Sequence, residues 1–189
     1  MQPVGVLGGT FDPVHNAHLA LARAALATLG LARILWIPTG NPPYREAPVA
    51  AAEHRVAMLE RALAGEDRFV IDARELAPGA TGYTVDTLIA LRADLGPEAP
   101  LVLLMGADQY AKLETWHRWR ELFDLCEIAV FARPGWTIAD GRARTVPLAP
   151  LAISASAVRA RIGRGEDVSA ALPAAVLDYI RRHHLYGHP

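Results

Sequence analysis

Short runs of consecutive apolar residues recur along the chain and alternate with longer stretches of mixed polarity. Such runs are typical of strands that are buried on both faces of a sheet. Strands are predicted on this basis at residues 4–7, 34–37, 69–71, 101–105 and 127–132, with a shorter one at 145–148. The runs fall well short of the ~18 apolar residues that a membrane-spanning helix requires, so the pattern indicates a globular fold.

The stretches between the predicted strands carry apolar residues at every third or fourth position, the spacing of amphipathic helices. In the first stretch Leu19, Leu26 and Leu29 lie on one stripe, with Asn16 expected to cap the helix and Gly30 to end it. Further helices are predicted at residues 51–64, 84–95, 108–113, 118–125, 154–162 and 173–184.

Alternation of strands and helices predicts an α/β fold, a Rossmann-like doubly wound parallel sheet with helices on both faces. We expect residues 1–189 to form a single domain, because neither a repeat nor a long linker divides them. In such sheets, ligands bind at the carboxyl ends of the strands. The unusual loops at residues 8–12, 39–45 and 106–108 each follow a predicted strand and are therefore expected to share one edge.

The composition narrows the range of partners. The 189 residues include 19 Lys and Arg against 20 Asp and Glu, a formal net charge of −1. This balance argues against nucleic acid and an anionic membrane surface as partners, but it is compatible with a small anionic ligand held by a few local cations. Cys126 is the only cysteine, and the first residues lack the basic region of a signal peptide, so we expect a cytoplasmic protein.

The segment Gly8-Gly9-Thr10-Phe11-Asp12-Pro13-Val14-His15-Asn16-Ala17-His18 is the most informative part of the chain. Two glycines after a strand let the backbone approach a ligand closely, and the N-terminus of the following helix is a natural phosphate site. His15 and His18 can share one face of that helix. Taken alone, the segment is equally compatible with a tight turn, a capped helix and two surface histidines; a zinc site is poorly supported without a nearby carboxylate or cysteine.

This segment resembles the His-x-Gly-His signature of a nucleotidyltransferase superfamily, and its longer form resembles bacterial nicotinate-nucleotide adenylyltransferases. Ala17 stands where the motif normally has Gly. The stretch Ile153-Ser154-Ala155-Ser156-Ala157-Val158-Arg159 resembles the second signature of the same family, Ile-Ser-Ser-Thr-x-Ile-Arg. Ser154 can cap a helix there, and the planar cation of Arg159 suits a polyphosphate.

Further stretches resemble the same family and extend the similarity over nearly the whole chain. Asn41-Pro42-Pro43-Tyr44-Arg45 is similar to its Asn-Pro-Pro-His-Lys loop, with Tyr and Arg at the last two positions. Gly82-Tyr83-Thr84-Val85-Asp86-Thr87-Leu88 is similar to Ser-Tyr-Thr-x-Asp-Thr-Leu, and Gly106-Ala107-Asp108 matches Gly-Ala-Asp. Trp116 lies where the family stacks a pyridine ring, although core packing is the commoner fate of a tryptophan.

The resemblance implies a nucleotidyltransferase-type fold and transfer of AMP from ATP to nicotinate mononucleotide, which yields nicotinate adenine dinucleotide and pyrophosphate in NAD biosynthesis. It implies catalytic roles for His15, His18 and Arg159, and Mg²⁺ carried with ATP rather than a metal site on the protein. The residues expected to bind ATP are Gly8, Gly9, Thr10, Phe11, Gly106, Asp108, Ile153, Ser154 and Ser156. Those expected to bind the acceptor are Asn41, Arg45, Tyr83, Thr84 and Trp116.

Two other functions stay open at this point. Related adenylyl- and cytidylyltransferases share the first motif and use other phosphate acceptors, such as nicotinamide mononucleotide or phosphopantetheine. A non-catalytic nucleotide-binding sensor could keep the same fold, although a pure binder has no need for groups that act in the transition state. Nucleic-acid binding is disfavoured because the chain lacks a basic stripe.

Overall fold

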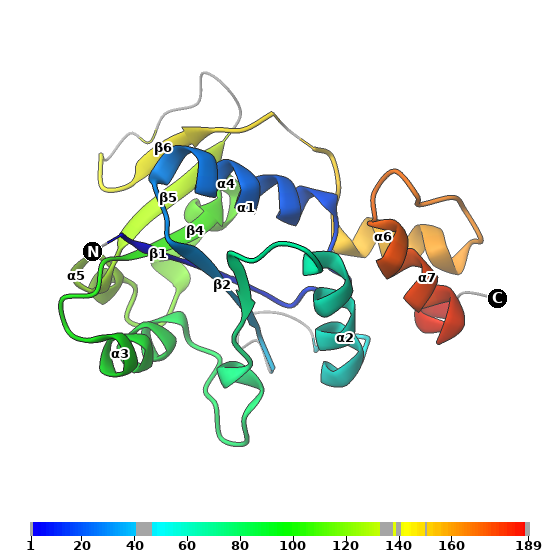
Figure 1. The fold of residues 1–189 in the computed structure, drawn as a ribbon, viewed down its shortest axis with the longest axis horizontal. Helices are drawn as coiled ribbons and strands as arrows, with labels where there is room; N and C mark the ends of the chain where they lie inside the picture. Colours follow the sequence, from blue (N-terminus) through cyan, green and yellow to red (C-terminus); the bar gives the residue numbers. More distant parts are fainter. Residues whose placement is uncertain (1, 41–46, 133–137, 139–140, 150, 188–189) are drawn as a thin grey trace.

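A computed structural model describes residues 2–40, 47–132, 138, 141–149 and 151–187 (Figure 1). Its centre is one sheet of six parallel strands in the order β3-β2-β1-β4-β5-β6. The strands are β1 (Val4–Gly9), β2 (Arg33–Pro38), β3 (Phe69–Ile71), β4 (Leu101–Gly106), β5 (Glu127–Ala132) and β6 (Arg144–Pro147). The predicted doubly wound α/β fold is confirmed.

Seven α-helices and four short 3₁₀ helices are assigned among the described residues. The α-helices are α1 (Asn16–Leu29), α2 (Ala52–Leu63), α3 (Thr84–Leu95), α4 (Ala107–Tyr110), α5 (Leu122–Leu125), α6 (Ala155–Gly163) and α7 (Ala174–Arg182). The 3₁₀ helices are η1 (Arg74–Leu76), η2 (Leu113–Thr115), η3 (Trp119–Glu121) and η4 (Leu185–Gly187). The helices predicted at 108–113 and 118–125 are each broken into shorter pieces.

The predicted cap of α1 is wrong by one residue. His15 is the N-cap, with extended backbone, and Asn16 is already helical. Asn16 instead joins α1 to a segment far along the chain. Its side-chain amide donates to the carbonyl of Ala170 at 3.0 Å, and its backbone N–H donates to the carbonyl of Ala171. The predicted end of the helix is confirmed, since Gly30 adopts the left-handed conformation with a φ of 62°.

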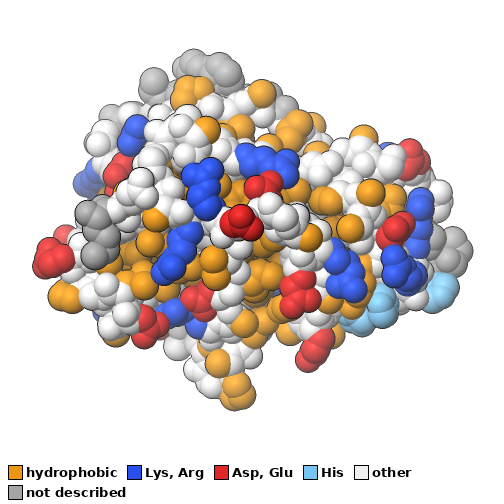
Figure 2. Space-filling model, viewed as in Figure 1, with side chains coloured by type: hydrophobic (Ala, Val, Ile, Leu, Met, Phe, Trp, Pro, Cys, Tyr) orange, Lys and Arg blue, Asp and Glu red, His pale blue; other side chains and the backbone are white. Residues whose placement is uncertain are grey.

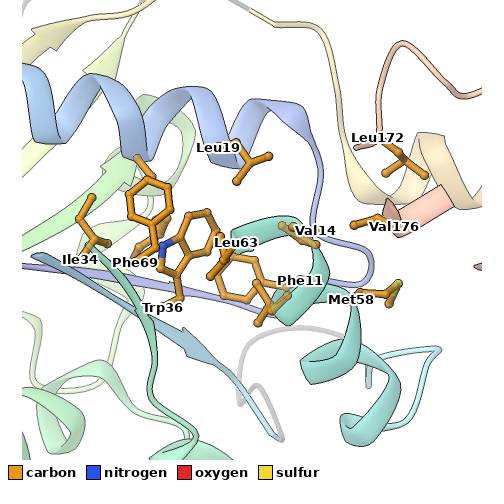
Figure 3. Close-up of a cluster of buried hydrophobic side chains, with 14 of the residues drawn as sticks. Phe11, Val14, Leu19, Ile34, Trp36, Met58, Leu63, Phe69, Leu172 and Val176 are labelled. Atoms are coloured by element: carbon orange, nitrogen blue, oxygen red, sulfur yellow. The ribbon is translucent and has the colours of Figure 1, made fainter. Parts of the chain in front are cut away.

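Two clusters of buried side chains cover the two faces of the sheet. One includes residues of α1, α2, α6 and α7, and the other includes residues of α3 and α5. Figure 1 shows α3 and α5 on the side of the sheet opposite α1. Figure 3 shows Phe11 and Val14, from the loop after β1, among the side chains of Trp36, Met58 and Leu63. The first cluster therefore anchors this loop as well as the helices.

The strand order places the loops of interest together. The chain runs outward from β1 to β2 and β3, and then returns to the other side of β1 with β4. Ligands of such sheets bind at the carboxyl ends of the strands, where the order reverses. Because every pairing is parallel, the loops after β1, β2 and β4 leave the same edge, as predicted.

The surface carries both signs of charge. On the face shown in Figure 2, basic and acidic side chains are interspersed among apolar ones, and histidines lie at the end where α7 is found. In the part of the chain that the structure describes, no helix has both the length and the apolar character that crossing a bilayer requires.

Candidate active site

The end of β1 exposes the backbone of Gly8, and the loop that follows is anchored by its side chains. Gly8 is exposed, and a Cβ added there would meet no atom within 4 Å. Phe11 has a φ of 49°, a conformation that costs roughly 1–2 kcal/mol for a residue with a Cβ. Its ring is only 1% exposed, and burial of this size, worth about 2–3 kcal/mol, offsets the cost. Phe11 thus holds the loop in a shape that leaves the Gly8 backbone accessible.

His15 and His18 form a stacked pair at the start of α1. Their ring centroids are 3.7 Å apart, with planes inclined by only 14°. The backbone N–H of His15 donates to Nδ1 of His18 at 3.2 Å. Because Nδ1 of His18 accepts this hydrogen bond, a neutral imidazole carries its proton on Nε2. The rings of Phe11 and His18 pack in a T-shaped arrangement, with their centroids 5.1 Å apart. The local structure therefore fixes the ring position of His18 and favours one tautomer.

His15 is a buried, neutral histidine. Its side chain belongs to a residue that is 6% exposed, and burial lowers the pKa of His15 to about 4. Its Nδ1 atom is buried and has no hydrogen-bond partner among the described residues. The alternative of two surface histidines is wrong for this residue, and His15 does not contribute a positive charge near neutral pH.

Asp12 is the most highly connected side chain of the loop. Its carboxylate accepts hydrogen bonds from the backbone N–H groups of Val49, at 2.7 Å, and Ala50, at 3.1 Å. The hydroxyl of Tyr186 donates to the same carboxylate at 2.8 Å. Since these donors precede α2 and follow α7, Asp12 joins the loop after β1 to two distant segments. The residue is 3% exposed and fully engaged by protein donors.

Arg159 reaches the same loop from α6. Its Nη1 donates to the backbone carbonyl of Asp12 at 2.8 Å and lies 3.7 Å from the carboxylate. The predicted cap is confirmed, because Oγ of Ser154 accepts from the N–H of Ala157, and Ser156 lies within 3.3 Å of that hydroxyl. Ile153, just before the cap, is partly buried against the first core cluster. The structure thus places the second motif against the first.

The segment Gly106-Ala107-Asp108 ends β4 at the same edge of the sheet. Gly106 is the N-cap of α4, and Asp108 lies within the first turn of this helix. A Cβ added to Gly106 would approach Oδ1 of Asp108 to 2.7 Å. The carboxylate is exposed and folds back over the end of the strand, where it can accept hydrogen bonds from ribose hydroxyls.

Three of the residues expected on the acceptor side gather at the start of α3. Tyr83 is the N-cap of α3, and its ring packs against that of His117 with centroids 4.4 Å apart and planes inclined by 31°. Trp116 and Tyr83 are both half-buried against the edge of the second core cluster. The first turn of α3, which begins at Thr84, supplies backbone N–H groups beside these rings. Asn41 and Arg45 lie outside the described residues.

Sequence reasoning missed one buried cation at this edge. Arg55, in the first turns of α2, is 2% exposed. Its Nη1 donates to the carbonyl of Thr10 at 2.7 Å and to that of Thr39 at 2.8 Å. Its position one turn before Leu59, on the apolar stripe of α2, was the available signal.

In the described ranges, no three or more His, Cys, Asp or Glu side chains are grouped so that they could hold an ion. The arrangement instead combines imidazoles, a guanidinium and helix N-termini, which are groups that bind phosphate oxygens.

Comparisons with known proteins agree with this description. Residues 6–161 match the family model described as cytidylyltransferase-like. A protein of Laribacter hongkongensis, named as a probable nicotinate-nucleotide adenylyltransferase, is 45% identical over 97% of this chain and 94% of its own length. A protein of the same name from Dechloromonas aromatica is 42% identical over 98% of both chains.

A solved structure shares the fold. It is the nicotinic acid mononucleotide adenylyltransferase of Plasmodium falciparum complexed with NaAD, with a TM-score of 0.83 over 100% of this chain and 99% of that chain. Its sequence is 17% identical, so this likeness concerns the fold alone.

Proposed function

The chain belongs to the cytidylyltransferase-like family, among relatives named as nicotinate-nucleotide adenylyltransferases, and from this premise we propose that it transfers AMP from ATP to nicotinate mononucleotide. The products are nicotinate adenine dinucleotide and pyrophosphate, a step of NAD biosynthesis. One structural observation supports the proposal more strongly than any other. The stacked imidazoles of His15 and His18 stand at the N-terminus of α1, on the loop that also receives Arg159.

The reaction needs no general base. The acceptor is a phosphate monoester whose second pKa is about 6, so its attacking oxygen is already an anion at neutral pH. That oxygen forms a bond to the α-phosphorus of ATP, and the bond from this phosphorus to the bridging oxygen of pyrophosphate breaks. The protein's task is to align two anions and to stabilise the charge that develops in line.

We assign His18 to the α-phosphate, where a proton on Nε2 can be donated to a non-bridging oxygen in the transition state. His15, being neutral, orients the α- and β-phosphates through a hydrogen bond rather than through charge. Arg159, Ser156 and the N-terminus of α6 hold the leaving pyrophosphate. The N–H groups of the loop after β1 complete the ATP site, and Asp108 accepts from the ribose.

On the acceptor side, Trp116 and Tyr83 receive the pyridine ring, and the N-terminus of α3, at Thr84, receives its carboxylate. Asn41 and Arg45 are assigned to the acceptor's own phosphate. Mg²⁺ enters as part of the Mg–ATP substrate, whose phosphate oxygens and waters supply most of its ligands. We place the reaction in the cytoplasm, which suits a chain with the single, buried Cys126.

One experiment tests the proposal against its alternatives. The protein is incubated with Mg–ATP and, in separate reactions, nicotinate mononucleotide, nicotinamide mononucleotide and phosphopantetheine, and released pyrophosphate is measured. We expect the fastest release with nicotinate mononucleotide. Faster release with another acceptor would reassign the substrate, and ATP binding without release in any reaction would indicate a sensor.

A further inference from the structure

A buried guanidinium connects two loops at the candidate site. Nη1 of Arg55 donates to the carbonyls of Thr10 and Thr39, at 2.7 and 2.8 Å. Thr10 follows β1 and belongs to the loop assigned to ATP, whereas Thr39 follows β2 and begins the segment assigned to the acceptor's phosphate. A single side chain therefore bonds to two backbone segments that are assigned to different substrates.

The acceptor segment is attached to the ATP loop at both ends. At its start, the N–H of Thr39 donates to the carbonyl of Gly9 at 2.9 Å, in addition to the contact with Arg55. At its far end, the N–H groups of Val49 and Ala50 donate to the carboxylate of Asp12. Asn41 and Arg45 belong to the stretch between these attachments.

The chemistry of the site explains why an arginine is found here. A guanidinium can donate several hydrogen bonds in a fixed planar fork, whereas a lysine offers a compact charge on a flexible stem. Burial lowers the pKa of Arg55 and the nearby Asp12 carboxylate opposes this shift, yet a guanidinium stays charged in either case. A buried charge is weak evidence for a contribution to stability, since apolar side chains that replace a whole buried ion pair often do so without loss.

We propose that Arg55 is a positioning residue of the transfer reaction, which fixes the ATP loop and the acceptor loop at the separation that in-line attack requires. This inference rests on the proposed function. Arg55 touches neither substrate; it acts through the backbone of Thr10 and Thr39. Loss of the connection leaves each loop able to bind its own substrate but no longer holds the two phosphates in reacting geometry.

The test separates binding from turnover. Arg55→Met and Arg55→Lys are compared with the wild type in kcat and in the dissociation constants for ATP and nicotinate mononucleotide, each titrated alone. We expect kcat to fall roughly ten- to hundredfold, because a displacement of about 1 Å is enough for such a loss. Both dissociation constants should stay within about threefold of the wild-type values, because each substrate is titrated alone and is bound by only one of the two loops.

Arg61→Met is the matched control. Arg61 lies on the same helix, but its guanidinium packs over the ring of Tyr179 and donates to the carbonyl of Ala57, away from both loops. Turnover by this variant should be unchanged. An unchanged kcat in both Arg55 variants would overturn the proposal. A parallel loss of kcat and of both affinities would overturn it too, because it would indicate a merely structural role.

A second readout does not depend on activity. Amide hydrogen exchange is followed by mass spectrometry in the peptides that contain Thr10 and Thr39. In Arg55→Met both peptides should exchange faster, while exchange in β5 stays unchanged. Unchanged exchange in either peptide would overturn the proposal that Arg55 holds both segments in place. A wild type that releases no pyrophosphate would instead refute the proposed function, so the two failures are distinguishable.

Discussion

The hydroxyl of Tyr186 donates a hydrogen bond of 2.8 Å to Oδ1 of Asp12, joining the end of the described chain to the loop after the first strand. Burial, followed by the charge of the carboxylate, raises the pKa of Tyr186, so the phenol stays protonated and acts as a donor. The backbone carbonyl of Asp12 is in turn the acceptor for Arg159. The segment after α7 therefore supports the residue assigned to the leaving pyrophosphate.

Replacing Tyr186 by Phe should lower both stability and turnover. The free energy of unfolding should fall by about 1–3 kcal/mol, because a buried carboxylate loses a hydrogen-bond donor. We also expect kcat to fall, since the loop that holds Arg159 is less firmly fixed. Tyr179→Phe is the matched control, because that hydroxyl also makes a hydrogen bond, to His54, but away from the site. Equal kcat losses in both variants would show that general destabilisation is responsible.

The neutral state of His15 should make the fold sensitive to acid. In the unfolded chain His15 has an ordinary pKa, whereas in the folded protein burial lowers it to about 4. Between these values the unfolded state binds more protons, so stability falls as the pH falls. This single group should remove about 2 kcal/mol between pH 7 and pH 5.

Chemical denaturation of the wild type and of His15→Gln at those two pH values measures this contribution. The variant should lose less stability on acidification, by about the amount expected for one buried histidine. His117→Gln, which changes an exposed histidine, is the control for the loss of an imidazole. A wild type and a His15→Gln variant with identical pH dependence would contradict a buried neutral His15.

The elements most accurately predicted from the sequence are those whose pattern is decided locally. Helix α3 and strand β5 have the bounds that their apolar spacing indicated. The gathering of three loops at one edge was also predictable, because it follows from parallel strands alone. The second signature motif was linked to the first only by the family resemblance, and the contact from Arg159 to the carbonyl of Asp12 is what places the two together.

The features that were missed depend on partners far along the chain. Asn16 and His15 are both polar and adjacent, and the hydrogen bond that engages the Asn16 side chain comes from a carbonyl at Ala170, far along the chain. Arg55 is of a residue type that is usually solvated, and its burial depends on the carbonyls of Thr10 and Thr39. Such tertiary hydrogen bonds produce no periodic pattern in the sequence. A charged residue on the apolar stripe of a helix indicates only that some partner must exist, not which one.

His18 should matter to turnover much more than to ATP affinity. The contact from the N–H of His15 to Nδ1 favours a proton on Nε2, the atom assigned to the α-phosphate. Removing one such donor typically costs about 10²–10³ in kcat. His18→Ala should show this loss, measured as pyrophosphate release, while the dissociation constant for ATP changes by less than about tenfold. Equal losses in turnover and affinity would remove the role in the transition state.

Trp116 tests the acceptor side, because the residue is half-buried against the second core cluster and could serve either packing or stacking. If it stacks on the pyridine ring, Trp116→Ala should raise KM for nicotinate mononucleotide by about tenfold, the order of an aromatic pair, and leave KM for ATP unchanged. Trp116→Phe should restore most of the affinity. Trp119→Ala is the control, since Trp119 packs against Phe123 in the same cluster. An unchanged KM for the acceptor in Trp116→Ala, accompanied by a loss of stability like that of the control, would assign Trp116 to the core, because a loss of packing lowers the melting temperature without distinguishing between the two substrates.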